Sequence, residues 1–134
     1  MKTVLTVGVF DLLHLGHVEL FRKAKALGDR LVVAVQDSES VEKYKPGCPT
    51  VNSTEARMYV VKAIKYVDDV VVYSDVDKII NTVDFDIFVF GGDQKHKGFQ
   101  AVEQWCSEHG KEMIRLPRTE GISSSEIKEH IRNL

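Results

Sequence analysis

The chain has 134 residues, a length that supports one hydrophobic core, and we expect a single domain over residues 1–134. Its 18 basic and 20 acidic residues give a formal net charge of −2, so no broad charged field favours nucleic acid or an anionic membrane as a partner. Cys48 and Cys106 lie outside any Cys-X-X-Cys pattern, and no apolar stretch reaches the length of a membrane span. We therefore expect free thiols and a cytoplasmic location.

Short β-branched runs alternate with helical patterns along the chain. Residues 31–35 and 87–90 are apolar throughout, which is typical of strands that helices cover on both faces. The alternation predicts a Rossmann-like, three-layer α/β fold around a five-stranded parallel sheet. The expected strands are Thr3–Val7, Arg30–Gln36, Asp69–Tyr73, Asp86–Gly91 and Glu112–Leu116.

Helices are expected between these strands and after the last one. The first covers about Gly16–Leu27 and ends before Gly28, since glycine often follows the end of a helix. Asn52 and Glu55 resemble a capping box that opens a helix reaching about Tyr66. The remaining expected elements are a short helix from Ser74 with Asp77, a helix over about Phe99–Gly110, a last helix from Ser123 with Glu126, and a loop over residues 45–49.

The segment from Gly8 to His17 joins the first strand to the first helix and carries two histidines. At a helix start, His14 and His17 would lie close to backbone N–H groups that have no partner inside the helix. Such a site suits a polyphosphate, and Gly16 leaves room for an anion to approach. Helix capping by one histidine, or a solvated helix surface, is the alternative interpretation. A transition-metal site would need a third ligand, and we expect no metal-binding residues here.

A second group of residues follows the fifth strand. In open parallel sheets ligands bind beyond the carboxyl ends of the strands, where the strand order reverses. Arg118 comes directly after this strand, and Ser123 marks the start of the last helix. A forked cation and a helix N-terminus together would form a second cradle for phosphate, although simple helix capping also explains the serine.

Two motifs connect these observations to a known family. Gly-X-Phe-Asp-X-X-His-X-Gly-His at residues 8–17 and Arg-Thr-Glu-Gly-Ile-Ser at residues 118–123 together resemble the nucleotidylyltransferase superfamily. Within it, the chain is similar to the small cytidylyltransferases, which include the glycerol-3-phosphate enzymes. The resemblance extends over essentially the whole chain. It departs at Val9, where the glycerol-3-phosphate enzymes tend to carry threonine, and this difference bears on the acceptor.

The resemblance implies roles for the residues that match the two motifs. His14 and His17 are expected at the α-phosphate, either protonated or as neutral N–H donors. Arg118 is expected to bind the β- and γ-phosphates. The other nucleotide-binding positions are Gly8, Val9, Phe10, Gly16, Asp93, Thr119, Gly121, Ile122, Ser123 and Ser124, with Asp93 expected at the ribose or cytosine.

Four charged residues outside this set have competing interpretations. Lys43 and Lys45 match a Lys-X-Lys segment that supplies mobile cations to the triphosphate, but lysines beside a loop are often only solvated. Asp11 is expected to bind acceptor hydroxyls or orient a histidine, with an Asx-turn as the alternative. Arg57 is expected to reach an acceptor phosphate, with a surface ion pair as the alternative.

The implied activity is transfer of CMP from CTP to a small phosphorylated acceptor with release of pyrophosphate, assisted by Mg²⁺ or another divalent cation. Glycerol 3-phosphate is the leading acceptor; phosphocholine, phosphoethanolamine and phosphorylated sugars or amino acid derivatives are also possible. Transfer of AMP from ATP, or nucleotide binding without turnover, are the alternative functions. The resemblance also implies a homodimer with Lys65–Asp68 in the contact region.

Overall fold

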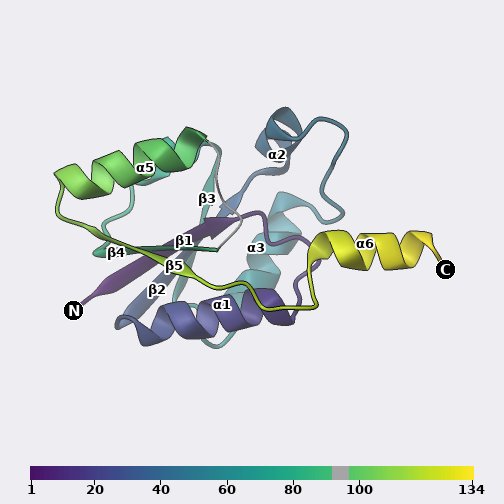
Figure 1. Cartoon of the computed structure of the whole chain (residues 1–134), viewed down its shortest axis with the longest axis horizontal. Helices are drawn as coiled ribbons and strands as arrows, with labels where there is room; N and C mark the ends of the chain where they lie inside the picture. The colour runs from purple at the N-terminus through teal and green to yellow at the C-terminus, as the bar shows by residue number, and fades with distance from the viewer. Residues whose placement is uncertain (92–96) are drawn as a thin grey trace.

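The computed structural model describes residues 1–91 and 97–134. Five parallel strands form one sheet in the order β3-β2-β1-β4-β5, with helices on both faces (Figure 1). The strands are β1 (Thr3–Gly8), β2 (Arg30–Gln36), β3 (Asp69–Tyr73), β4 (Ile87–Gly91) and β5 (Glu112–Leu116). The helices are α1 (Leu15–Ala26), α2 (Ser38–Tyr44), α3 (Thr54–Lys62), α4 (Val76–Ile79), α5 (Lys97–Glu108) and α6 (Ser124–Arg132). The predicted three-layer α/β fold is confirmed.

The order of the strands reverses between β1 and β4. From β1 the chain moves outward through β2 to β3, and it then crosses back to build β4 and β5 on the other side of β1. This reversal leaves a crevice at the carboxyl ends of β1 and β4, because the following segments leave toward opposite sides. The segments after β1 and β5, which contain the two sequence motifs, both start at this edge of the sheet.

Two apolar clusters hold the layers together, one on each face of the sheet. On one face Phe21 of α1 and Val61 of α3 pack against Val33 of β2, and each of these three side chains is 0% exposed. On the other face Val102 of α5 packs against Phe88 of β4. Strand residues alternate between the two clusters, so continuous apolar runs are required, as expected for strands covered on both sides.

The structure corrects several element boundaries. The N-cap of α3 is Ser53, whose hydroxyl accepts from Ala56 N–H at 3.1 Å, because Asn52 donates instead to Asp11. That helix ends at Lys62, before the predicted Tyr66. Helix α4 has Asp75 rather than Ser74 as its N-cap. Helix α2 was not predicted from the sequence, although Asp37 caps it by accepting from Ser40 N–H at 2.7 Å.

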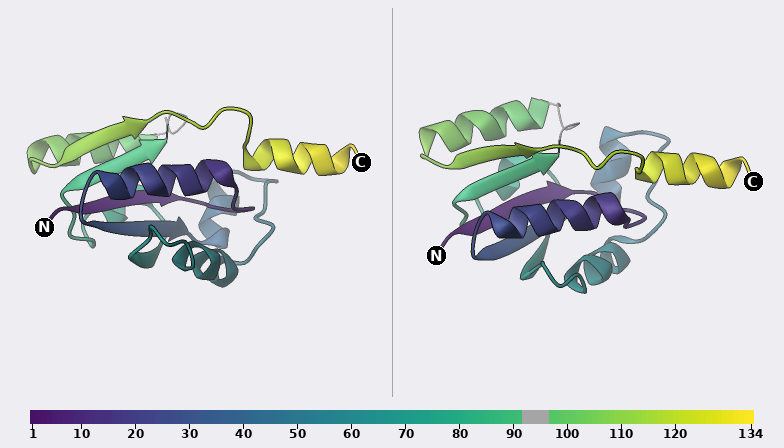
Figure 2. Two further views of the ribbon diagram at one scale, coloured as in Figure 1. Left: turned by 90° about the horizontal axis from the view of Figure 1, so that it is seen from below. Right: turned by 60° about the horizontal axis from the view of Figure 1, so that its bottom comes forward.

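The last helix extends away from the body of the sheet (Figure 2). All of α6 is described, and none of its residues is fully buried. Its N-cap is the predicted Ser123, whose hydroxyl accepts from Glu126 N–H at 3.1 Å. Within residues 1–91 and 97–134, no helix is both long enough and apolar enough to cross a membrane.

Candidate active site

The turn between β1 and α1 has an unusual backbone that places its side chains. Phe10 and Leu12 adopt φ angles of +54° and +50°, a left-handed conformation that non-glycine residues rarely take. The Phe10 ring folds back over Gly8, where an added Cβ would lie 2.8 Å from the ring. Phe10 is 6% exposed and makes an edge contact with His17 at a centroid distance of 5.4 Å. Gly8 therefore leaves room for the Phe10 ring, and this ring packs against His17.

Both histidines cap α1 through one ring nitrogen. His14 is the N-cap residue, and its Nδ1 accepts from Gly16 N–H at 3.0 Å. Nδ1 of His17 accepts from the backbone N–H of His14 at 3.2 Å, which completes a capping box. The two rings are stacked with centroids 3.9 Å apart. Both residues therefore cap the helix, where the alternative interpretation had only one, and the caps use Nδ1 and leave both Nε2 atoms for other partners.

The caps determine the protonation state of the rings. An Nδ1 atom that accepts a hydrogen bond carries no proton, so a neutral ring must be protonated at Nε2. The pKa of His17 is lowered to about 4, mainly by burial and also by the neighbouring His14, against an opposing effect of Asp11. Burial also lowers the pKa of His14, with Arg118 adding to the effect. Of the two predicted forms, the geometry favours neutral N–H donors.

Gly16 has a role in the cap of α1 in addition to the one that the sequence suggested. A Cβ at this position would lie 2.8 Å from Cε1 of His14 and 3.0 Å from its Nδ1. The glycine thus makes room for the capping imidazole, rather than only for an incoming anion. Any larger residue would push His14 out of its cap.

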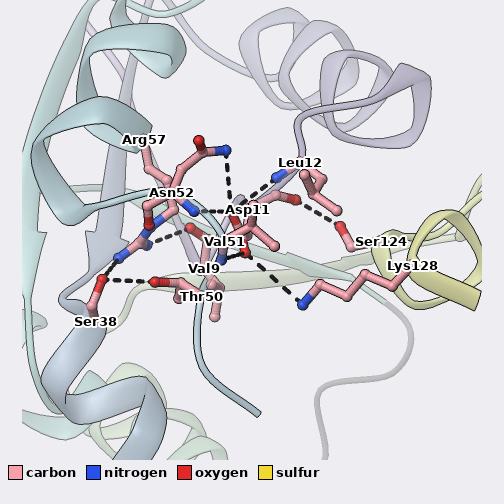
Figure 3. A network of polar contacts seen from close by, with 10 residues as sticks. All are labelled: Val9, Asp11, Leu12, Ser38, Thr50, Val51, Asn52, Arg57, Ser124 and Lys128. Atoms are coloured by element: carbon pink, nitrogen blue, oxygen red, sulfur yellow. Dashed lines mark hydrogen bonds and ion pairs between the residues drawn. The ribbon is translucent and has the colours of Figure 1, made fainter. Parts of the chain in front are cut away.

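Asp11 connects the first turn to the loop before α3 (Figure 3). Its carboxylate is 5% exposed and accepts from Val51 N–H at 2.6 Å and from Asn52 N–H at 3.1 Å. The Leu12 N–H and the Asn52 side-chain amide also donate to it. Three of these donors reach Oδ1 and one reaches Oδ2, and together with the burial of the side chain these contacts favour an organising role over direct binding of acceptor hydroxyls.

Arg57 does not reach the cavity, so the prediction that it contacts an acceptor phosphate is wrong. The residue is 1% exposed, and all five guanidinium N–H groups donate within the protein. Its acceptors are the carbonyls of Val9, Gln36 and Asn52 and the hydroxyls of Ser38 and Thr54. Nor does Arg57 form the surface ion pair of the alternative with any residue of 1–91 or 97–134. It is instead buried where the ends of β1 and β2 meet the start of α3 (Figure 3).

The segment after β5 forms the opposite wall. Gly121 has a φ of +81°, which turns the chain from the strand end into α6. Ser123 caps this helix, and the Ser124 hydroxyl donates to the backbone carbonyl of Asp11 at 2.7 Å. The N-termini of α1 and α6 are thereby joined across the crevice, although 113 residues separate Asp11 from Ser124.

A cavity of about 980 Å³ lies between these two walls. It is large enough for a nucleotide, and most of the predicted site residues line it. Those on the first wall are Gly8, Val9, Phe10, Asp11, His14, Gly16 and His17, with Lys45 nearby, and those on the second are Arg118, Thr119, Ile122, Ser123 and Ser124.

Besides Arg57, two described residues of the prediction, Lys43 and Gly121, are not part of that lining. Lys43 lies on α2 with its ammonium 5.7 Å from the ring centroid of Tyr44, outside the cavity. Gly121 shapes the adjacent turn. Asp93 lies outside the described residues. Of the predicted pair, only Lys45 is therefore placed for contact with a ligand in the cavity.

The cavity also contains residues that the sequence analysis missed. Lys128 and Arg132 of α6 line it together with Lys23 of α1. A signal for Lys128 was present, because residues four apart on a helix share a face and Ser124 was already assigned to the site. No comparable signal marked Lys23, whose contribution depends on the way α1 packs.

Comparison with known proteins shows which family this chain belongs to. A family described as cytidylyltransferase-like matches residues 5–130, which include both sequence motifs. The chain belongs to the cytidylyltransferase-like family. It is therefore a nucleotidyltransferase, and the family relationship implies that it uses a nucleotide as substrate.

Individual relatives match over most or all of the chain. A glycerol-3-phosphate cytidylyltransferase of Bacillus subtilis is 40% identical, and the alignment covers 100% of both chains. The bifunctional protein HldE of Yersinia pestis is 38% identical over 98% of this chain, which corresponds to 28% of that larger protein. Among solved structures, a lipopolysaccharide core biosynthesis protein from Thermoplasma volcanium has a TM-score of 0.74 and 28% identity, with 89% of this chain and 97% of that chain covered.

Proposed function

We propose that this nucleotidyltransferase transfers CMP from CTP to glycerol 3-phosphate, giving CDP-glycerol and pyrophosphate. The observation that carries the proposal is the 40% identity over 100% of both chains to a glycerol-3-phosphate cytidylyltransferase. The cavity supports it, since its residues offer N–H donors and cations to phosphate on two opposite walls.

The reaction is an in-line displacement. An oxygen of the acceptor phosphate attacks the α-phosphorus of CTP and forms a new P–O bond. The bond from the α-phosphorus to the oxygen bridging the α- and β-phosphates breaks, and pyrophosphate leaves with that electron pair. Such a reaction needs correct placement of two anions and stabilisation of the charge that develops, without a covalent intermediate.

Different residues of the cavity place the anions and stabilise the developing charge. The Nε2–H groups of His14 and His17 donate to the α-phosphate and to the bridging oxygen as charge builds up. Lys45 and Arg118 bind the charge that the triphosphate already carries in the ground state. The free N–H groups at the start of α6, next to Ser123 and Ser124, hold the terminal phosphates.

The divalent cation enters with the nucleotide. Within the described residues there is no cluster of three or more His, Cys, Asp or Glu side chains able to hold a metal ion. Mg²⁺ commonly binds through substrate phosphates and retains several waters, so the triphosphate itself supplies suitable ligands. When bound, the cation neutralises charge on the phosphates.

The test is a screen of pyrophosphate release. The purified protein is assayed with CTP or ATP and Mg²⁺ against glycerol 3-phosphate, phosphocholine, phosphoethanolamine and a set of sugar phosphates. We expect CTP with glycerol 3-phosphate to give the highest kcat/KM. A higher value with ATP would make the protein an adenylyltransferase, and a higher value with another phosphomonoester would replace the acceptor. No turnover with any pair would favour nucleotide binding without catalysis.

A further inference from the structure

Lys128 is a cation of the cavity to which neither the sequence motifs nor the family match assigns a role. It lies on α6, four residues after Ser124, and its side chain points toward the first turn (Figure 3). Its ammonium nitrogen is 3.9 Å from Oδ2 of Asp11, and 31% of the side chain is exposed. Because Lys128 also lines the 980 Å³ cavity, a ligand can reach it there.

The pairing with Asp11 is loose and is not needed to hold the carboxylate. A distance of 3.9 Å is too long for a hydrogen bond, and the Lys128 ammonium donates none to any residue within 1–91 or 97–134. Asp11 already accepts four shorter bonds, at 2.6 to 3.4 Å, from Leu12, Val51 and Asn52. The three ammonium donors can therefore turn toward an anion without leaving Asp11 unsatisfied.

Lys128 faces the Asp11 carboxylate at 3.9 Å, whereas the charge of Arg118 acts on His14. Arg118 lies on the second wall with Thr119 and Ser123, where the β- and γ-phosphates are proposed to bind. Asp11 precedes His14 by three residues, and its charge is close enough to act on His17. Lys128 is thus placed next to the turn whose two histidines are proposed to contact the α-phosphate, and the acceptor phosphate must arrive at that phosphate.

We infer that Lys128 binds the phosphate of the acceptor and that Asp11 holds the ammonium in place before the acceptor arrives. The inference rests on the proposed function, because it assumes an acceptor that carries a phosphate. Two phosphorylated anions must approach one another in this cavity, and a cation on the acceptor side offsets their repulsion. Ion pairing with Asp11 also lowers the cost of keeping the ammonium in a partly enclosed site.

The test compares Lys128→Met with the parent protein in steady-state assays with CTP and glycerol 3-phosphate. Loss of a charge-assisted hydrogen bond should raise the KM for glycerol 3-phosphate about 10- to 100-fold. The KM for CTP should change less than about 3-fold, and Lys128→Arg should recover most of the loss. An unchanged KM for glycerol 3-phosphate, or an equal rise in both KM values, would overturn the inference.

A matched control comes from Lys78, which forms a similar pair with Asp75 at 3.3 Å but lies outside the cavity. Lys78→Met should leave both KM values unchanged. If the parent protein does not use glycerol 3-phosphate, the proposed function is contradicted. If the parent uses it but Lys128→Met shows no rise in the KM for glycerol 3-phosphate, only the inference about Lys128 is contradicted.

Inorganic phosphate provides a second probe that needs no turnover. It should stabilise the CTP-bound parent against thermal unfolding more than CTP-bound Lys128→Met. Equal stabilisation of the two proteins would contradict binding of phosphate at Lys128.

Discussion

At the scale of single residues, the two histidines divide their ring nitrogens between structure and chemistry. Nδ1 of each ring closes the capping box of α1, and Nε2 is left to donate into the cavity. A positively charged ring would carry a proton on Nδ1 and break the cap. Capping therefore keeps both rings neutral and ready to donate, so the two roles reinforce one another.

This coupling predicts a pH dependence of stability. The pKa of His17 is about 4 in the folded protein, compared with 6.5 ordinarily, so the unfolded chain binds more protons between these values. The stabilisation is fully present above pH 6.5 and is lost as the pH falls toward 4. Melting curves between pH 7 and 4 should show a steeper decline for the parent than for His17→Gln. Parallel declines would mean that folding does not lower the pKa of His17.

Arg57 is expected to be important for stability rather than binding. Arg57→Met removes five hydrogen bonds of a side chain that is 1% exposed and takes away the donor to the carbonyls of Val9, Gln36 and Asn52, so unfolding by urea should show a loss of roughly 3–5 kcal/mol. Arg22→Met removes an exposed arginine that pairs with Glu19 and should change stability little. A variant of Arg57 as stable as that control would contradict the buried network.

Arg57 also illustrates the limit of residue chemistry as a guide. An arginine near the start of a helix can face solvent, a phosphate or backbone carbonyls, and its type does not distinguish these cases. Its burial depends on how the ends of β1 and β2 meet α3, which are distant in sequence. The motifs at residues 8–17 and 118–123 were better guides, because each lies within one local turn and cap.

At the scale of elements, the site is built from two helix N-termini that one hydrogen bond joins. The alternation of strands with helices and the Ser123 cap could be predicted from the sequence, because both are local patterns. Helix α2 was missed because its seven residues are mostly polar and make no clear apolar face. The loop of residues 49–52 likewise takes its position from Asp11, which no local pattern reveals.

The cap of α6 should affect nucleotide binding. Without fully buried residues, α6 relies on its N-terminal contacts, and Ser123→Ala should cost about 1 kcal/mol of local helix stability. We expect roughly 5-fold weaker CTP binding by titration calorimetry.

Ser53→Ala is the matched control, because the Ser53 hydroxyl caps α3 with the same 3.1 Å bond but lies outside the cavity. It should lower global stability without changing CTP affinity. Equal effects of the two substitutions on CTP affinity would argue against a role for the α6 N-terminus.

At the scale of the whole molecule, the β3 edge of the sheet and α3 present apolar side chains that a second copy could cover. Tyr59 is 80% exposed, Val60 45% and Val72 49%. The Lys65–Asp68 segment, expected at a dimer contact, lies between α3 and β3. Sedimentation at micromolar concentration should give about twice the chain mass of 15.1 kDa, and Tyr59→Glu should shift it toward monomer. A parent that sediments as a monomer would contradict the dimer without affecting the proposed catalysis.

The most direct test of the account is the kinetics of His17→Gln. Glutamine is a usual residue at the third position of a capping box, so this variant keeps the cap of α1 and removes the imidazole. If the Nε2–H group of His17 stabilises charge in the transition state, kcat with CTP and glycerol 3-phosphate should fall about 10²- to 10³-fold, with a much smaller change in CTP affinity. A folded variant that turns over at nearly the parent rate would show that His17 only caps the helix.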